Sequence, residues 1–145
     1  MKINPKTGID KLVFGMLQKD VEEVYGKSDK ISTDEEDNKI LQYNKQKISL
    51  TFYTDEGFKL GYLTTSNPEL QLFDKKIIGR PAADVLKELE AVGWTKWEKG
   101  EFEMQETFFN ESNWTIFYVE YNEIVKVEVG AIFNDKDEFE WKFKK

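Results

Sequence analysis

Two segments of the chain, 64 residues apart, share a short pattern and are followed by the same order of structural signals. In each segment an apolar residue and a glycine precede an aspartate and a valine: Phe14, Gly15, Asp20 and Val21 match Ile78, Gly79, Asp84 and Val85. A chance match is the alternative. A repeat would dominate the fold, because each unit buries its apolar face against its neighbour. We therefore expect one domain over 1–145, with repeat 1 at about 9–74 and repeat 2 at about 75–145.

Each repeat is predicted to open with an amphipathic helix, at about Leu17–Tyr25 and about Pro81–Val92. Apolar residues recur at the helical period in both segments, and Gly26 and Gly93 follow as helix terminators. Proline suits the first helical position, where its missing N–H would be unpaired anyway, so we expect Pro81 to be the first residue of the second helix.

Alternating apolar and polar residues predict strands after each helix. The segments are Lys39–Tyr43, Lys47–Tyr53, Phe58–Thr65 and a short one near Leu70–Phe73, then Phe102–Phe109, Trp114–Tyr121, Ile124–Phe133 and Phe139–Phe143. The predicted fold class is therefore α+β. Two tandem repeats, each a helix plus antiparallel strands, form one antiparallel sheet of about eight strands with two helices on one face.

The composition excludes several classes of chemistry. The 145 residues include no Cys and no His, which excludes disulfides, thiol nucleophiles, zinc-thiolate sites and imidazole bases. The formal net charge of −7 argues against nucleic acid or an anionic membrane as a partner. No apolar run approaches the roughly 18–20 residues that a membrane span needs.

The first residues do not form a secretory signal, because no hydrophobic stretch follows Lys2. We favour a cytoplasmic location, and the alternative is an exported protein whose leader has been removed.

The acidic residues do not predict an active site. Glu101, Glu103, Glu128 and Glu140 are interpreted as the polar side of half-buried strands. The run Asp34–Asp37 is interpreted as a solvated loop, because it lacks the spaced aspartates of a calcium loop. No phosphate-binding or dinucleotide-binding motif is present. We therefore predict no enzyme activity, no catalytic residues, no cofactor and no metal.

The stretch from Phe14-Gly15-Met16 through Val21 to Gly26 resembles the repeat opening of the β-lactamase-inhibitor-protein-like superfamily, which includes SmpA/BamE-like lipoproteins. The resemblance implies two helix-plus-strand repeats in one eight-stranded sheet and a binding surface on that sheet. The second copy departs from the pattern at Arg80-Pro81, and the family's cysteines are absent.

These observations favour a non-enzymatic protein-binding module, of the inhibitor or immunity-protein type, that binds a basic protein through its sheet face. Aromatic side chains beside acids supply buried area and charge attraction. The candidate partner-binding residues are Tyr43, Tyr53, Trp114, Tyr118 and Glu120. The alternatives are an envelope or secreted scaffold domain of the BamE-like kind and a self-associating structural domain. A loop or tail covering the second face of 114–121 would also explain the aromatics there.

Overall fold

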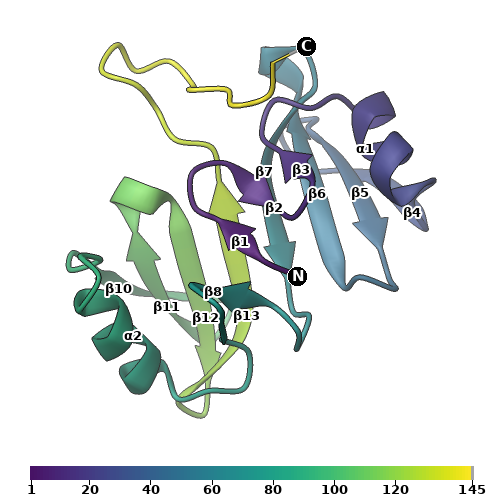
Figure 1. The fold of residues 1–145 in the computed structure, drawn as a ribbon. Coiled ribbons are helices and arrows are strands. Elements are labelled where there is room, and N and C mark those ends of the chain that lie inside the picture. The colour runs from purple at the N-terminus through teal and green to yellow at the C-terminus, as the bar shows by residue number, and fades with distance from the viewer. Residues whose placement is uncertain (145) are drawn as a thin grey trace.

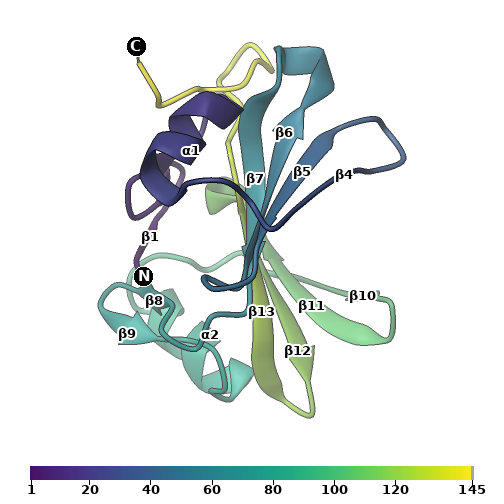
Figure 2. The ribbon, with the colours of Figure 1, turned by 90° about the vertical axis from the view of Figure 1, so that its right-hand side faces the viewer.

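A computed structural model describes residues 1–144 and shows an α+β fold built around one antiparallel sheet. Its eight strands lie in the order β10-β11-β12-β13-β7-β6-β5-β4, and both helices lie on one face (Figures 1 and 2). Four strands follow helix α1 and the other four follow helix α2. The elements of the sheet are β4 (Lys30–Thr33), β5 (Lys39–Tyr43), β6 (Ile48–Tyr53), β7 (Lys59–Thr65), β10 (Glu98–Phe102), β11 (Gln105–Asn110), β12 (Thr115–Glu120) and β13 (Glu123–Gly130), with α1 at Gln18–Tyr25 and α2 at Ala82–Glu90.

The two groups of four strands join through β7 and β13, which pair antiparallel with Val129 opposite Leu63. On the helix side a row of apolar residues crosses this junction, because Leu41, Leu50, Leu63 and Val129 are aligned by the register of four neighbouring strands. All four are fully buried. This row is the centre of the core between the sheet and the helices.

The first residues of the chain fill the space between the two helices. Strands β1 (Ile3–Asn4), β2 (Gly8–Ile9) and β3 (Leu12–Val13) form a small antiparallel sheet, and a second hairpin pairs β8 (Gln71–Leu72) with β9 (Lys75–Lys76). Figure 1 shows this layer across the junction of the large sheet. Ile9, Leu12 and Phe14 are fully buried there, so the N-terminal segment is part of the core.

Both helices begin one residue later than the sequence predicts. At α1 the Asp20 carboxylate accepts a hydrogen bond from the Leu17 N–H at 2.9 Å, which satisfies one donor at the helix start. At α2 the backbone of Pro81 is extended, so Pro81 precedes the helix and is not its first residue. Val85 and Leu89 face the core, and α2 ends at Glu90 instead of Val92.

Two strand predictions are wrong. The segment Phe102–Phe109 is not one strand, because the chain reverses at Glu103 and Met104, both with positive φ, and β10 and β11 pair across that turn. The segment Phe139–Phe143 is not a strand, and a single bridge joins Phe133 to Phe139. The sequence pattern also missed β4 and the short N-terminal strands, which have too few residues to show an alternation.

The residues after β13 pack by aromatic stacking instead. Phe139 stacks on Phe133, on Trp141 and on Tyr53, with ring centroids 4.5, 4.9 and 5.3 Å apart. The Phe143 N–H donates to the Phe14 carbonyl at 3.0 Å. The alternating aromatics of this segment therefore pack ring against ring and do not form a strand. The segment runs along the end of the sheet and is yellow in Figure 1.

Within residues 1–144, none of the helices has the length and apolar character that crossing a membrane requires.

We predict that Leu63→Ala lowers the free energy of unfolding by about 2–5 kcal/mol, because it leaves a cavity in the centre of the core. Its neighbour Thr64 faces the other side of β7, and Thr64→Ala is the matched control, with an expected change below about 1 kcal/mol. Urea unfolding followed by tryptophan fluorescence measures both. Equal losses would contradict this assignment of the core face.

Candidate functional site

The face of the large sheet that points away from the helices, here called the outer face, carries polar and aromatic side chains. The strand register aligns Gln42, Ser49, Thr64 and Glu128 across four strands on this side. Each of them alternates with a core residue, as the two-residue period of a strand requires. Both helices lie on the opposite side of the sheet, so no helix of residues 1–144 covers the outer face (Figure 2).

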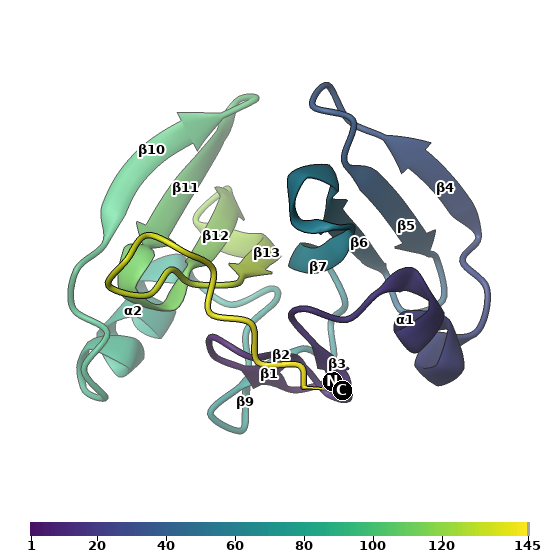
Figure 3. The ribbon, with the colours of Figure 1, turned by 90° about the horizontal axis from the view of Figure 1, so that it is seen from above.

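The outer face is concave, because the two four-stranded halves diverge from the β7–β13 junction. Seen from above, the β4–β5 and β10–β11 hairpins rise on either side of that junction (Figure 3). Between them lies an open groove of about 700 Å³ lined by Thr33, Asp34, Glu35, Glu36, Tyr62 and Phe102. We call this groove the trough. Tyr62 lies on its floor strand, and the other residues come from its two walls.

Three tyrosines and one glutamate surround the floor of the trough. The rings of Tyr53 and Tyr62 have centroids 5.9 Å apart, and the Tyr118 ring meets Phe102 edge-on at 6.2 Å. The Tyr118 hydroxyl donates to Glu128 Oε1 at 3.4 Å, while Lys126 Nζ lies 4.3 Å from the centroid of the Tyr118 ring. Aromatic area and hydrogen-bonding groups therefore occur together here.

Two small residues make room for the aromatic side chains. A Cβ atom on Gly61 would lie 2.0 Å from the Tyr53 ring, and one on Gly130 would lie 2.4 Å from the Trp114 ring. Any other residue at these positions would force the rings to move. The backbone of β7 and the end of β13 therefore serve as platforms for Tyr53 and Trp114.

Glu128 is the acid most affected by this environment. Burial raises its pKa above the usual value, although hydrogen bonds from Tyr118 and Trp114 and the charge of Lys126 favour the ionised form. Burial also raises the pKa values of Tyr53, Tyr62 and Tyr118, and the Glu128 charge adds to each of these shifts. The three hydroxyls consequently stay protonated at neutral pH and can donate hydrogen bonds.

The acidic wall of the trough is a structured turn. Asp34 accepts hydrogen bonds from the Glu36 N–H at 2.9 Å and from the Asn38 N–H at 3.0 Å. Its partial burial opposes ionisation, but these hydrogen bonds together lower the pKa of Asp34. The same turn leaves Glu35 and Glu36 exposed, so the wall presents negative charge toward solvent.

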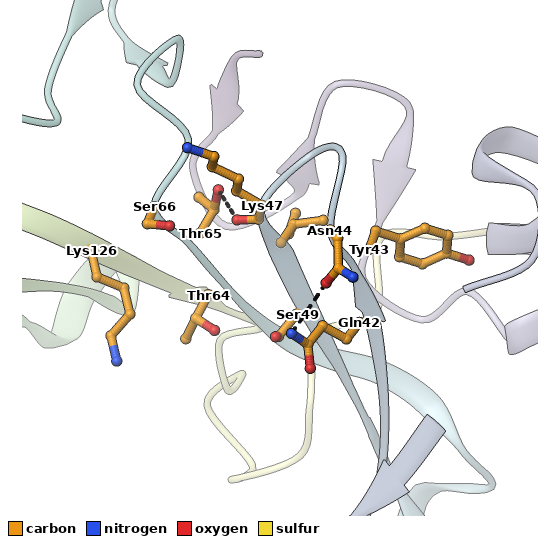
Figure 4. Close-up of a pocket in the computed structure, with 10 residues that line it drawn as sticks. Gln42, Tyr43, Asn44, Lys47, Ser49, Thr64, Thr65, Ser66 and Lys126 are labelled. Atoms are coloured by element: carbon orange, nitrogen blue, oxygen red, sulfur yellow. Dashed lines mark hydrogen bonds between the residues drawn. The ribbon is translucent and has the colours of Figure 1, made fainter. Parts of the chain in front are cut away.

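A second, polar pocket of about 280 Å³ lies at the other end of the outer face, beside the β5–β6 connection and the end of β7 (Figure 4). Gln42, Ser49, Thr64 and Lys126 point to the same side of the sheet in this view, whereas Tyr43 points away from them. Gln42 Nε2 donates to Asn44 Oδ1 at 3.4 Å, and Thr65 Oγ1 donates to the Lys47 carbonyl at 2.9 Å. Amides, hydroxyls and two lysines therefore bound this end.

Four of the five residues predicted for partner binding lie on the outer face or at its margin. Tyr53 and Trp114 are half-buried, Tyr118 keeps 8% of its surface exposed, and Glu120 is exposed and accepts a hydrogen bond from Gln105. Tyr43 does not belong to this surface. It is 2% exposed on the helix side, where its hydroxyl donates to the Gly26 carbonyl at 2.8 Å.

The sequence analysis missed the contributions of Tyr62, Phe102 and Glu128. The alternation along β7 put Tyr62 on the same side as Thr64, and Glu128 was interpreted as an ordinary polar residue of a strand. Phe102 was assigned to a continuous strand that does not exist. Only the pairing of β7 with β13 brings Tyr62 and Glu128 together, and no local pattern encodes that pairing.

Among residues 1–144, no group of three or more acidic side chains is arranged to hold a metal ion.

Two solved structures have a similar fold at low sequence identity. One is an extracellular protein that contains an SCP domain, from Bacillus anthracis, with a TM-score of 0.55 and 12% identity over 89% of this chain and 50% of that chain. The other is a cysteine-rich secretory protein from Staphylococcus aureus, with a TM-score of 0.53 and 10% identity over 81% of this chain and 44% of that chain. This chain thus spans about half the length of each. No protein-family model and no curated protein matches it in sequence.

These likenesses overturn the resemblance to the β-lactamase-inhibitor-protein-like and SmpA/BamE-like superfamily. The motif that suggested it has another role in the structure. The Gly15 N–H donates to the Leu60 carbonyl at 3.0 Å, and the Leu60 N–H donates to the Met16 carbonyl at 2.8 Å. Gly15 and Met16 therefore attach the N-terminal segment to the start of β7 before α1 begins.

The raised pKa of Glu128 predicts a pH-dependent stability difference. A carboxyl whose pKa is raised by folding contributes stability at low pH that is lost as the pH rises through its folded value. Glu128→Gln should therefore match the wild type near pH 3 and become the more stable of the two as the pH rises to 7. Urea unfolding at the two pH values measures this. Glu120→Gln is the control and should show little change, and a Glu128→Gln difference independent of pH would contradict the prediction.

Proposed function

We propose that this chain is a non-enzymatic protein-binding domain whose trough takes a basic segment of another protein. The observation that supports it is the combination of aromatic rings and acidic side chains in one groove. Tyr62 and Phe102 line the same groove as Asp34, Glu35 and Glu36. The few residues that carry most of the binding energy at protein interfaces are enriched in tyrosine and tryptophan, and charge complementarity selects the partner and speeds encounter.

The charge of the walls favours a cationic partner. The chain has a formal net charge of −7, and the opposite wall adds Glu103 at the tip of the β10–β11 hairpin. A lysine or arginine side chain entering the trough would meet carboxylates from the walls and the faces of aromatic rings, both of which attract cations. A stoichiometric inhibitor or immunity protein of a cationic enzyme fits these features.

The tyrosines of the trough suit binding better than catalysis. Burial raises the pKa values of Tyr53, Tyr62 and Tyr118, so none of these hydroxyls is poised to act as a base at neutral pH. Protonated phenols are hydrogen-bond donors with a large apolar ring, which is the type of side chain that anchors protein interfaces. We therefore assign no catalytic residue.

We also propose that the two halves of the single domain are tandem repeats. Helix α1 precedes β4–β7 and helix α2 precedes β10–β13 in the same order. The pairing of β7 with β13 then places the last strand of each half at the centre of the sheet. In this interpretation the trough is the concave side of the junction between two copies of one unit.

An exported protein is the location we favour. The two proteins of similar fold are described as extracellular and as secretory, which supports the exported alternative over the cytoplasmic one. At 10–12% identity the likeness concerns the fold, so the location is a proposal to be tested by fractionating the source cells.

Binding of a basic probe tests the proposed function. We predict that a decapeptide of alternating lysine and glycine binds the wild type and shifts the amide resonances of Tyr62 and Glu128. The triple variant Glu35→Gln, Glu36→Gln and Glu128→Gln should bind at least about tenfold more weakly, since it removes acidic side chains from the wall of the trough and from the outer face beside it. Isothermal titration calorimetry and NMR measure the affinity and the location.

The double variant Glu22→Gln and Glu23→Gln, on α1, is the control for loss of acidic charge, and it should bind the lysine peptide as the wild type does. The matching glutamate–glycine peptide should not bind. Equal affinity of the triple variant and the wild type, or resonance shifts confined to the helix face, would overturn the proposal.

The turn of the β10–β11 hairpin gives a second prediction. Glu103 and Met104 both have positive φ, a conformation that favours Asn-Gly and is strained for longer side chains. Glu103→Asn with Met104→Gly should stabilise the fold by about 1–2 kcal/mol, because it relieves that strain. The same change removes a wall carboxylate and an exposed methionine, so it should weaken binding of the lysine peptide. Thermal unfolding and calorimetry measure the two effects, and unchanged binding would exclude this tip from the binding surface.

A further inference from the structure

The outermost strand of the sheet on the second half, β10, has one edge without a partner strand. Among the strands of residues 1–144 it pairs with β11 alone, and all five of its residues are exposed, including Phe102 at 53%. An exposed edge of this length can add another strand through its backbone groups. Whether β10 can do so depends on which of its backbone groups are free and on the charges of its side chains.

The two-residue turn determines which backbone groups of β10 are free. In a hairpin closed by a two-residue turn, the residues that flank the turn form a hydrogen-bonded pair, and such pairs recur at every second position. Phe102 and Gln105 flank the turn here, and Gly100 lies opposite Thr107. The N–H and C=O groups of Lys99 and Glu101 therefore point away from β11, toward the open edge.

The charges of these two residues determine one register for a second copy of the same strand. An antiparallel copy centred on Gly100 brings Lys99 opposite Glu101 of the other chain, twice. The two adjacent registers bring Lys99 opposite Lys99 or Glu101 opposite Glu101, and like charges directly opposite one another are destabilising. The central glycine has no side chain to obstruct the approach.

In the described part of the chain, Glu101 also lacks a compensating charge. It lies directly opposite Glu106 across β10 and β11, and it forms no ion pair among residues 1–144. Lys99 lies 3.6 Å from Glu106 in an exposed pair. A Lys99 from a second copy would supply the cation that Glu101 lacks.

We infer that β10 pairs with β10 of a second copy and forms a twofold symmetric dimer with a continuous sheet of sixteen strands. Pairing of identical edges closes after two chains, whereas pairing of β10 with β4 would continue into a filament. The twofold axis runs perpendicular to the sheet, so the two outer faces lie on the same side and both troughs stay open. The contact is narrow, and a weak, concentration-dependent dimer is expected.

Charge reversal tests this pairing in the full chain. Sedimentation equilibrium over a wide concentration range should show a monomer–dimer equilibrium for the wild type. Lys99→Glu alone and Glu101→Lys alone should each weaken the dimer at least about tenfold, because each creates like-charge pairs across the interface. The double variant should restore wild-type affinity, because it exchanges the two charges and keeps them complementary.

A backbone variant tests the interface without charge. Lys99→Pro removes an N–H group that points away from β11, and the hydrogen bonds between β10 and β11 remain. It should therefore abolish the dimer, while the circular dichroism spectrum stays unchanged. Lys30→Glu on β4, the opposite edge, is the matched control and should dimerise as the wild type does. A wild type that stays monomeric at all concentrations, a double variant without rescue, or loss of the dimer in Lys30→Glu would overturn the inference. These readouts do not depend on a bound partner, so the inference and the proposed function can fail separately.

Discussion

The antiparallel pairing of β7 with β13 is the interaction on which the rest of the structure depends. Each half of the chain supplies four strands, and this one ladder, from Val127 opposite Thr65 to Gly130 opposite Tyr62, makes them a single sheet. On the helix side the same ladder aligns Leu63 with Val129 in the core. On the outer face it brings Tyr62 beside the strand that carries Glu128. A sheet broken at this point would have neither a continuous core nor a trough.

Local patterns in the sequence predicted the two helices and many of the residues that the sheet buries against them. The alternation of Ile48, Leu50 and Phe52 with Ser49, Thr51 and Tyr53 assigned the two faces of β6 as the structure has them. Helix periodicity located α1 and α2 to within one or two residues. These segments were predictable because their burial depends on period alone, which the sequence displays directly.

The outer face was harder to predict, because its residues meet through contacts distant in the sequence. Tyr43 is a residue type that is common at interfaces. The alternation of side chains along β5 nevertheless places it on the core side, where its hydroxyl donates to the Gly26 carbonyl. The chain reversal at Glu103 and Met104 carries none of the residues that usually mark a tight turn, so β10 was not separated from β11. The alternating aromatics at the end of the chain imitate a strand, although they stack on one another and on Tyr53.

The aromatic residues of the outer face also explain why the chain has glycines within strands and a tryptophan with a positive φ. Gly61 and Gly130 lie within central strands, where glycine contributes no side-chain packing and weakens a strand. Both are needed because the rings of Tyr53 and Trp114 occupy the space that a side chain would fill. Trp114 itself has a positive φ of 42°, which is costly for so large a residue. Such costs persist where the surrounding packing enforces them, and here Phe139 stacks on Tyr53 and Phe133 meets Trp114 edge-on, so the C-terminal segment packs against both rings. The proposed binding surface therefore depends on the other aromatics of this face, Tyr62, Phe102 and Tyr118, which lie in or beside the trough.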